Sequence, residues 1–170
     1  SLQRFFDRMS SGVSSAWDPD AARELLEFHE SWLGNRILRA QSTRRDARTL
    51  AKFQEWSRGF ELASQTRERV ELLRRIDRAL LSSQTAVWLN RAMLDAGLGS
   101  LGECLPPESA GPIRALRQRY AGEEPGLYAL AEDQVLRWNL YALRWISNAD
   151  LERYARLAES PAAQWWVVTC

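Results

Sequence analysis

The stretch that decides the fold reads SNADLERYARLAESPAAQWW, from Ser147 to Trp166. Ser147 can accept a hydrogen bond from a free amide at a helix start, and Asp150 can accept one from the Ser147 amide in return, which makes a capping box. Apolar residues then recur at steps of three and four, which predicts a helix with one buried face. The members of this face are Leu151, Tyr154, Ala155 and Ala158.

The dipeptide Ser160-Pro161 predicts a sharp corner between this helix and a second one. Proline has no amide proton and a fixed φ, which suits the first position of a helix but disfavours helical geometry in the preceding residue. Ser160 is therefore expected to end one helix and to cap the next. The whole stretch predicts a helix, a corner and a helix.

A degenerate copy of this unit lies near the front of the chain, where Asp18 to Ile37 reads DPDAARELLEFHESWLGNRI. At a constant offset, Asp18 takes the place of the capping Ser147. The apolar and corner residues correspond in the same way: Leu25 with Tyr154, Phe28 with Leu157, and Glu30-Ser31 with Glu159-Ser160. Few residues are identical, so an internal repeat and a chance likeness both stay open.

The helix, Ser-Pro-x-Gly corner and helix resemble the hallmark of domain of unknown function 2059, a family of mostly exported bacterial helical proteins. The C-terminal copy keeps Ser160 and Pro161 but has Ala163 where the family usually has glycine. The resemblance implies a bacterial helical protein that is periplasmic or secreted. It implies no activity and no catalytic residues, because none are established for the family.

The N-terminal copy departs from the same pattern at a different position. It keeps Ser31 and Gly34 but has Trp32 where proline is usual. The segment TRERVELLRRIDRALLSSQTAVWLN, from Thr66 to Asn90, is also similar to the middle of longer family members. The structural corner residues expected for the two copies are Ser31, Gly34, Ser160 and Pro161.

Composition indicates a compact helical protein. The 170 residues are 45% hydrophobic and include eight Trp, five Phe and four Tyr, and each buried aromatic removes about 150 to 250 Å² from water. The net charge of +1 offers no field for recruiting DNA or an anionic membrane, so nucleic acid is not a favoured partner. No apolar run approaches the roughly 18 residues of a transmembrane helix.

Periodicity predicts an all-α fold, an irregular bundle of about seven to nine helices without a sheet, in a single domain over residues 1–170. Helical spacing from Leu2 to Trp17 predicts a first helix. The apolar segment Leu127 to Ile146 predicts a buried central helix against which both helix-corner units pack. The expected order is a helix-corner unit at 18–40, central helices at 46–96, a Gly- and Pro-rich loop at 97–111 and C-terminal helices at 112–170.

Catalytic and metal-binding patterns are poorly represented. His29, the only histidine, falls inside a predicted helix beside Phe28, where bonding to a neighbour is favoured over catalysis. One histidine and two distant cysteines do not offer the ligand spacing of zinc sites, so no catalytic, cofactor-binding or metal residue is predicted. Most carboxylates alternate with arginines, as in solvated ion pairs; a carboxylate-based hydrolase stays the enzyme alternative.

Two surfaces are candidate interaction sites. The basic segment Arg36 to Arg48, densest at Arg44 and Arg45, could contact nucleic acid or another anionic polymer, although a solvated helix face is favoured. Trp165 and Trp166 differ by about 100° around a helix, so one of them should be exposed, or covered by a ligand, a dimer partner or further chain. The other interpretation is that both are partly buried beneath the chain termini.

Export would also bear on the two cysteines. In an exported protein Cys104 and Cys170 could form a disulfide, and otherwise they are unrelated thiols. The chain begins at Ser1 without methionine, as removal of a signal peptide would leave it, and as trimming would too. We expect a non-catalytic binding or structural module that acts on a protein or small ligand, with a homodimer as a further expectation.

Overall fold

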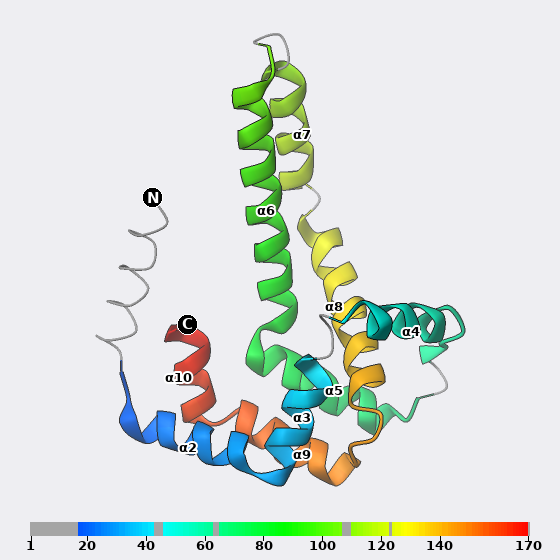
Figure 1. Ribbon diagram of the computed structural model, residues 1–170, viewed down its shortest axis with the longest axis vertical. Coiled ribbons are helices and arrows are strands. Elements are labelled where there is room, and N and C mark those ends of the chain that lie inside the picture. The colour runs from blue at the N-terminus through cyan, green and yellow to red at the C-terminus, as the bar shows by residue number, and fades with distance from the viewer. Residues whose placement is uncertain (1–16, 43–45, 63–64, 107–109, 123, 170) are drawn as a thin grey trace. The chain divides into compact units, whose positions relative to one another are not determined.

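The computed structural model describes residues 17–42, 46–62, 65–106, 110–122 and 124–169. Over these residues the chain forms nine helices and no strand, which confirms the predicted all-α fold and helix number (Figure 1). The helices are α2 (Pro19–Glu30), α3 (Trp32–Ser42), α4 (Ala47–Arg58), α5 (Arg67–Leu80), α6 (Ser82–Cys104), α7 (Ala110–Gly122), α8 (Glu124–Ala142), α9 (Asn148–Ala158) and α10 (Pro161–Thr169). The helix predicted from Leu2 to Trp17 lies outside the described residues except for its last residue.

The chain divides into two compact units, while its organisation as a single domain over residues 1–170 stays a prediction. Unit 1 consists of Ser1–Leu80 together with Leu136–Cys170, and unit 2 consists of Leu81–Val135. Length alone predicted one domain because 170 residues can share one core. Here α6 and α7 pack on each other within unit 2, whereas unit 1 draws its core from chain on both sides of unit 2.

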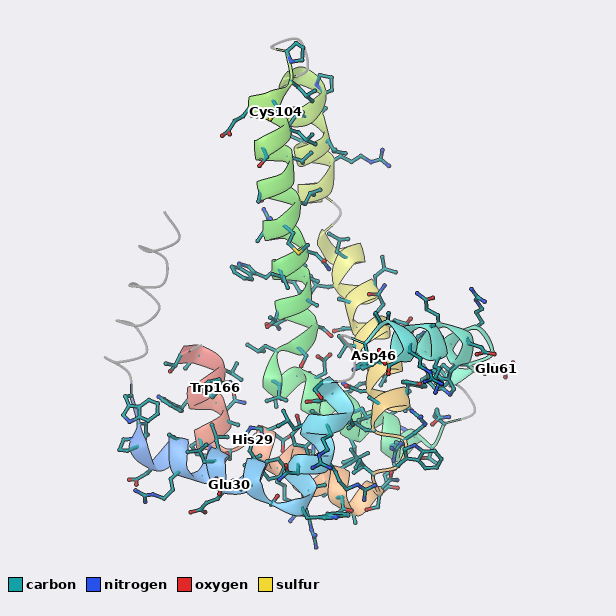
Figure 2. The ribbon with its side chains drawn as sticks, viewed as in Figure 1. His29, Glu30, Asp46, Glu61, Cys104 and Trp166 are labelled. Carbon is teal, nitrogen blue, oxygen red and sulfur yellow. The ribbon has the colours of Figure 1, made fainter. Side chains whose placement is uncertain are left out.

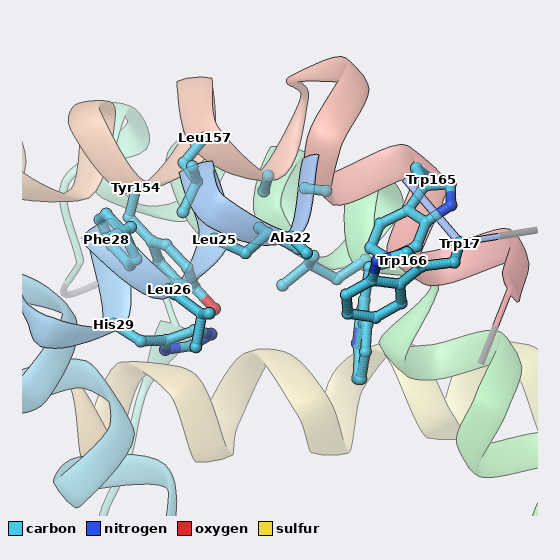
Figure 3. A pocket seen from close by; sticks show the side chains of 13 residues that line it. Trp17, Ala22, Leu25, Leu26, Phe28, His29, Tyr154, Leu157, Trp165 and Trp166 are labelled. Atoms are coloured by element: carbon cyan, nitrogen blue, oxygen red, sulfur yellow. The ribbon is translucent and has the colours of Figure 1, made fainter. Parts of the chain in front are cut away.

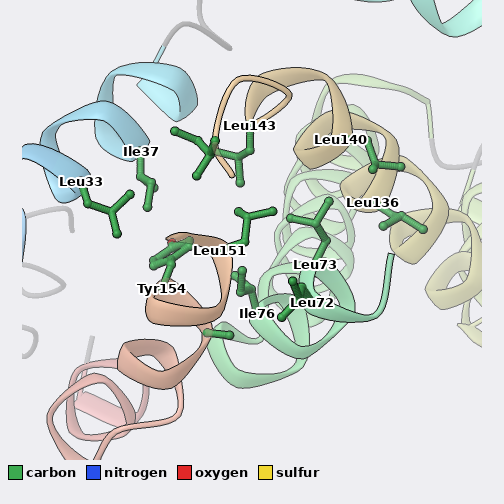
Figure 4. Packing of buried hydrophobic residues seen from close by; sticks show 12 residues of the cluster. Leu33, Ile37, Leu72, Leu73, Ile76, Leu136, Leu140, Leu143, Leu151 and Tyr154 are labelled. Atoms are coloured by element: carbon green, nitrogen blue, oxygen red, sulfur yellow. The ribbon is translucent and has the colours of Figure 1, made fainter. Parts of the chain in front are cut away.

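The core of unit 1 lies mainly among α3, α5, α9 and the C-terminal part of α8 (Figure 4). Its largest fully buried side chains are Leu73, Ile76, Leu143 and Leu151. The helices with the most extensive mutual contacts are α5 and α9, followed by α10 and α2. The two helix-corner units therefore pack on each other through α2 and α10, and the C-terminal unit packs on α5 through α9, so α8 is not their chief packing partner.

The prediction of a central helix from Leu127 to Ile146 is correct only in part. α8 ends at Ala142, and its C-terminal half buries Leu136 and Leu140. Leu130 in the other half is 60% exposed, and Trp145 beyond the helix end is 74% exposed. The physical reason for the exposure of Leu130 is that only the residues of α8 from Leu136 onward belong to unit 1 and can contribute to its core.

The predicted loop at 97–111 is also wrong over its first half. α6 continues through Gly97 and Gly102 to Cys104, and the chain leaves the helix at Leu105. A glycine costs only about 1 kcal/mol relative to alanine inside a helix, which packing offsets where the helix has a neighbour. Leu98 is buried, and α6 packs on α7 closely enough that a Cβ on Gly102 would lie 3.8 Å from Ile113.

The structure defines two helix starts within the segment predicted as central helices. α4 is a helix of its own, because Asp46 has extended geometry and its carboxylate accepts hydrogen bonds from the amides of Arg48 and Thr49 at 3.3 and 2.9 Å (Figure 2). α6 begins anew at Ser82, because Leu81 adopts a left-handed conformation with φ 51° and ψ 31°. The boundary between the two units falls at this residue.

Candidate functional site

Both predicted corners are present, and they are built alike. The hydroxyl oxygen of Ser31 accepts a hydrogen bond from the Gly34 amide at 3.0 Å, and that of Ser160 accepts one from the Ala163 amide at 3.3 Å. Each serine amide also donates to the carbonyl three residues before it, at 3.0 and 2.9 Å respectively. α10 begins at Pro161, as predicted.

The helix before each corner begins as the sequence predicts. The Asp18 carboxylate accepts hydrogen bonds from the amides of Asp20 and Ala21, both at 3.0 Å. At the equivalent position the Ser147 hydroxyl accepts one from the Asp150 amide at 3.1 Å and donates to the Asp150 carboxylate at 2.8 Å. Matching caps and matching corners support the internal repeat.

A further pair of equivalent residues was missed in the sequence. Asn35 and Gln164 each follow the corner by four residues, and each carboxamide turns back to donate to a carbonyl at the end of the preceding helix. The Asn35 bond to Glu30 measures 3.1 Å and the Gln164 bond to Ala158 measures 2.8 Å. An alignment of the two copies that scores similar side chains as well as identical ones could have found this pair, because both residues carry a carboxamide.

The two helix-corner units line an apolar cavity of about 380 Å³ (Figure 3). Two pairs of residues that correspond in the two copies line this cavity. Leu25 and Phe28 come from α2, and their counterparts Tyr154 and Leu157 come from α9. Ala22 and Ala163 add small side chains to the wall. All lining residues belong to unit 1, so the cavity is formed by that unit alone.

One end of the cavity consists of three tryptophans. Trp17 meets Trp165 edge-on with ring centroids 5.7 Å apart, and Trp165 lies 6.3 Å from Trp166. Trp166 is 51% exposed while Trp165 is half-buried, which confirms the prediction that one of the two is exposed. Trp17 is itself 55% exposed, so this end of the cavity presents indole surface to solvent.

The opposite end carries hydrogen-bonding aromatic side chains. Phe28 stacks on Tyr154 with centroids 5.9 Å apart and an interplanar angle of 7°, and it meets His29 edge-on at 5.9 Å. Figure 3 places the Tyr154 hydroxyl and the His29 imidazole at this end, away from the tryptophans. Burial raises the pKa of the Tyr154 hydroxyl, an effect that its hydrogen bond with Gln41 only partly opposes, so the phenol is neutral.

His29 lies within a helix beside Phe28, as predicted, but its contribution to a cavity wall was not foreseen. It lies in the last turn of α2, exposed, and lines the cavity beside Phe28. Helical spacing did indicate that Leu25 and Phe28 share an apolar face. It could not show that the C-terminal unit closes over this face and brings His29 to a cavity wall.

The charged side chains between α5 and α9 form ion pairs away from the cavity wall. The guanidinium of Arg75 donates to Glu159 at 3.0 and 2.8 Å and to Glu152 at 2.8 Å, which joins α5 to α9. Arg156 donates to Glu152 as well, at 3.1 Å. Among the residues whose burial is described, no aspartate or glutamate is buried, and no group of His, Cys, Asp and Glu there is arranged to hold a metal ion.

The basic segment is divided between two helices. Arg36 on α3 donates to the Trp145 carbonyl at 2.8 Å and lies 4.5 Å over the ring of Trp32. Arg48 is exposed on α4, and Arg44 and Arg45 lie outside the described residues. Arg36 is thus engaged within unit 1, and an anionic-polymer site on this segment stays a prediction.

The remaining sequence predictions concern the cysteines and the membrane. Cys104 is exposed and free at the last residue of α6 (Figure 2). Cys170 lies outside the described residues, so the disulfide stays a prediction. No helix in the described ranges is both long and apolar enough to cross a bilayer.

Comparisons with protein-family models, with curated proteins and with solved structures found no match. The class of protein is therefore described from the structure alone. Over the described residues it is an all-α chain in which two helix-corner-helix units line an apolar cavity.

Proposed function

We propose that this chain is a non-catalytic binding module and that the cavity between its helix-corner units holds a small apolar ligand. The observation that carries the proposal is the cavity itself. Its volume of about 380 Å³ lies within the range of about 300 to 1,000 Å³ that is typical of ligand sites. Trp17 and Trp166 leave apolar surface exposed at one end, and such surface on a folded protein often marks a binding site.

A binding role suits the chemistry of the wall better than a reaction does. Glu152 and Glu159 are held by arginines on the outside of the α5–α9 pair. The cavity contains His29, but among the described residues that line it there is no aspartate, glutamate, lysine or arginine to serve as a partner in proton transfer. The carboxylate-based hydrolase has no observation in its favour.

We further propose that the protein is exported by a bacterium to the periplasm or the medium. This part rests on the resemblance of the corner residues Ser31, Gly34, Ser160 and Pro161 to domain of unknown function 2059. Fractionation of the native cells with an antibody against the protein tests it. Recovery in the periplasm or medium is expected, and recovery with the cytosol would refute export.

Ligand binding is tested by titration with the neutral apolar dye N-phenyl-1-naphthylamine. We expect saturable binding at one site, with energy transfer from tryptophan to the dye. Trp166→Ala should weaken this binding, because Trp166 lines the cavity. Trp145→Ala is the matched control, since Trp145 is exposed and does not line the cavity.

Two results would contradict the proposal. The first is dye binding that does not saturate, or that the two tryptophan variants affect equally. The second is robust turnover of a generic ester, phosphate or glycoside substrate by the purified protein, which would overturn the non-catalytic assignment.

A further inference from the structure

We infer that the cavity selects an uncharged amphiphile, a molecule with an apolar body and one hydrogen-bonding end, and that His29 binds this end. The inference rests on the proposed function, because it assigns a ligand class to the same cavity. It starts from the chemical difference between the two ends of the cavity in Figure 3, where the tryptophans lie opposite His29 and Tyr154.

The tryptophan end suits the apolar body of the ligand. Trp165 and Trp166 present indole rings on neighbouring residues of α10, and Trp17 closes edge-on against the first of them. Aliphatic side chains of Leu25 and Leu157 continue the wall towards the other end. An alkyl chain or a flat hydrocarbon gains free energy over this whole length by leaving water, in proportion to the area that it buries.

The opposite end suits a neutral polar group. The Tyr154 hydroxyl already forms a hydrogen bond with the Gln41 side chain. His29 is therefore the lining side chain that we assign to the hydrogen bond with the ligand. A neutral imidazole has one nitrogen that donates and one that accepts. A hydroxyl group can satisfy either nitrogen, and an ester or amide carbonyl can accept from the donor.

Charge argues against an ionised ligand. None of the lining side chains in the described part of the chain carries a formal carboxylate, ammonium or guanidinium charge, and a charge moved out of water without a partner is strongly disfavoured. A carboxylate would meet a further obstacle, because His29 lies in the last turn of α2, where the backbone carbonyls carry partial negative charge. Glu27 and Glu30 flank the same turn.

The test compares three ligands that share one alkyl chain and differ only at the polar end: 1-dodecanol, dodecanoate and dodecyltrimethylammonium. Each competes with N-phenyl-1-naphthylamine for the intact chain, below the concentration at which it forms micelles. We expect dodecanol to displace the dye at a concentration at least about tenfold lower than either ion does. Longer alcohols should bind about fourfold more tightly for each added methylene until the cavity is full.

His29→Phe tests the role of the imidazole. It keeps an aromatic ring beside Phe28 but removes both nitrogens, and because His29 is exposed the fold should tolerate it. Affinity for dodecanol should fall about fivefold relative to affinity for the dye, which is titrated directly in the same variant, and fivefold is the range of one hydrogen bond. Trp145→Ala should change neither.

The outcomes separate the inference from the proposed function. Equal or tighter binding of dodecanoate or of dodecyltrimethylammonium overturns the inference while saturable dye binding upholds the site. Unchanged dodecanol affinity relative to the dye in His29→Phe overturns the assignment of His29. If the dye itself does not bind saturably, both the site and its ligand class fail.

Discussion

Gly34 shows how a single residue decides the geometry of a corner. A Cβ built on Gly34 would overlap the carbonyl oxygen of Phe28 and would lie 2.9 Å from the Cα of His29. The clash is with backbone, which cannot rotate away as a side chain can. At the equivalent position of the other corner, Ala163 is accommodated with its methyl group buried. The two corners have the same pattern of hydrogen bonds. At the corner of Ser31, however, the two helix backbones lie closer together than at the corner of Ser160.

Gly34→Ala should therefore lower the free energy of unfolding by about 2 kcal/mol or more, as overpacking against backbone does. Ala163→Gly is the matched change at the other corner. It should cost only about 1 kcal/mol, from helix propensity and one lost methyl contact. Urea unfolding followed by circular dichroism measures both values, and equal costs would show that the corners are equally open.

The pairs around Arg75 predict a dependence of stability on pH. Arg75 lowers the pKa of the Glu159 carboxyl below its ordinary value of 4.5, and Arg156 together with Arg75 lowers that of Glu152. Because these pKa values are lower in the folded state than in the unfolded chain, the stabilisation is fully present above about pH 5. It is lost as pH falls through the folded-state pKa values, when the carboxylates take up protons.

The free energy of unfolding should thus decline as the pH falls from about 5 to 3, and Arg75→Gln should make this decline shallower. Arg58→Gln, which alters an exposed arginine at the end of α4, is the control and should leave the slope unchanged. Chemical unfolding at several pH values provides the slopes. A decline of the same steepness in Arg75→Gln would mean that other carboxylates cause it.

At the scale of elements, the end of α8 depends on an arginine from a different helix. Arg69 of α5 donates to the carbonyls of Leu143 and Ile146 at 2.6 and 3.0 Å and to the Asn148 side chain at 2.9 Å. These carbonyls follow α8, where backbone acceptors otherwise lack helical partners. Partial burial lowers the pKa of the Arg69 guanidinium. The interaction connects α5 to the segment between α8 and α9.

Arg69→Ala should lower the free energy of unfolding by about 1 to 3 kcal/mol, because it removes a charged donor from part-buried acceptors. Arg69→Lys should recover only part of this loss, since an ammonium lacks the planar fork that serves several acceptors. Arg153→Ala, at a side chain that is 74% exposed, should change stability by less than about 0.5 kcal/mol. Thermal or urea unfolding would contradict this account if Arg69→Ala and Arg153→Ala behaved alike.

The segment RERVELLRRIDR illustrates what a local pattern can predict about an element. Its apolar residues recur at helical spacing, and α5 does bury Leu73 and Ile76 of this pattern. It also suggested that the arginines are solvated surface charges, which does not hold for Arg69 or for the inter-helix role of Arg75. The pattern could not distinguish them from Arg74, because their partners lie on chain far along the sequence.

At the scale of the whole molecule, unit 2 is inserted between the two parts of unit 1. The buried core of unit 1 is built from residues that precede Leu81 or follow Val135. The cavity is lined by residues from the same two parts. Unit 1 should therefore hold its fold and its cavity without unit 2.

Replacement of Leu81–Val135 by a flexible Gly-Ser linker of about 15 residues tests this expectation. We expect the shortened chain to unfold cooperatively and to bind N-phenyl-1-naphthylamine with unchanged affinity. Trp166→Ala in the shortened chain should weaken dye binding as it does in the full chain. A shortened chain that exposes its core to the dye without a cooperative transition would show that unit 2 is needed for the fold.

The sequence by itself determined most of the helices, their caps at Asp18 and Ser147, and the corners at Ser31 and Ser160, because capping, proline geometry and periodicity act over a few neighbouring residues. Only the tertiary structure decided that the chain forms two units, that Arg69 ends α8 and that a cavity places His29 opposite three tryptophans. These features depend on contacts between distant residues, such as the 2.9 Å bond from Gln164 to the Ala79 carbonyl. No local pattern records such contacts, because they arise from how whole helices pack.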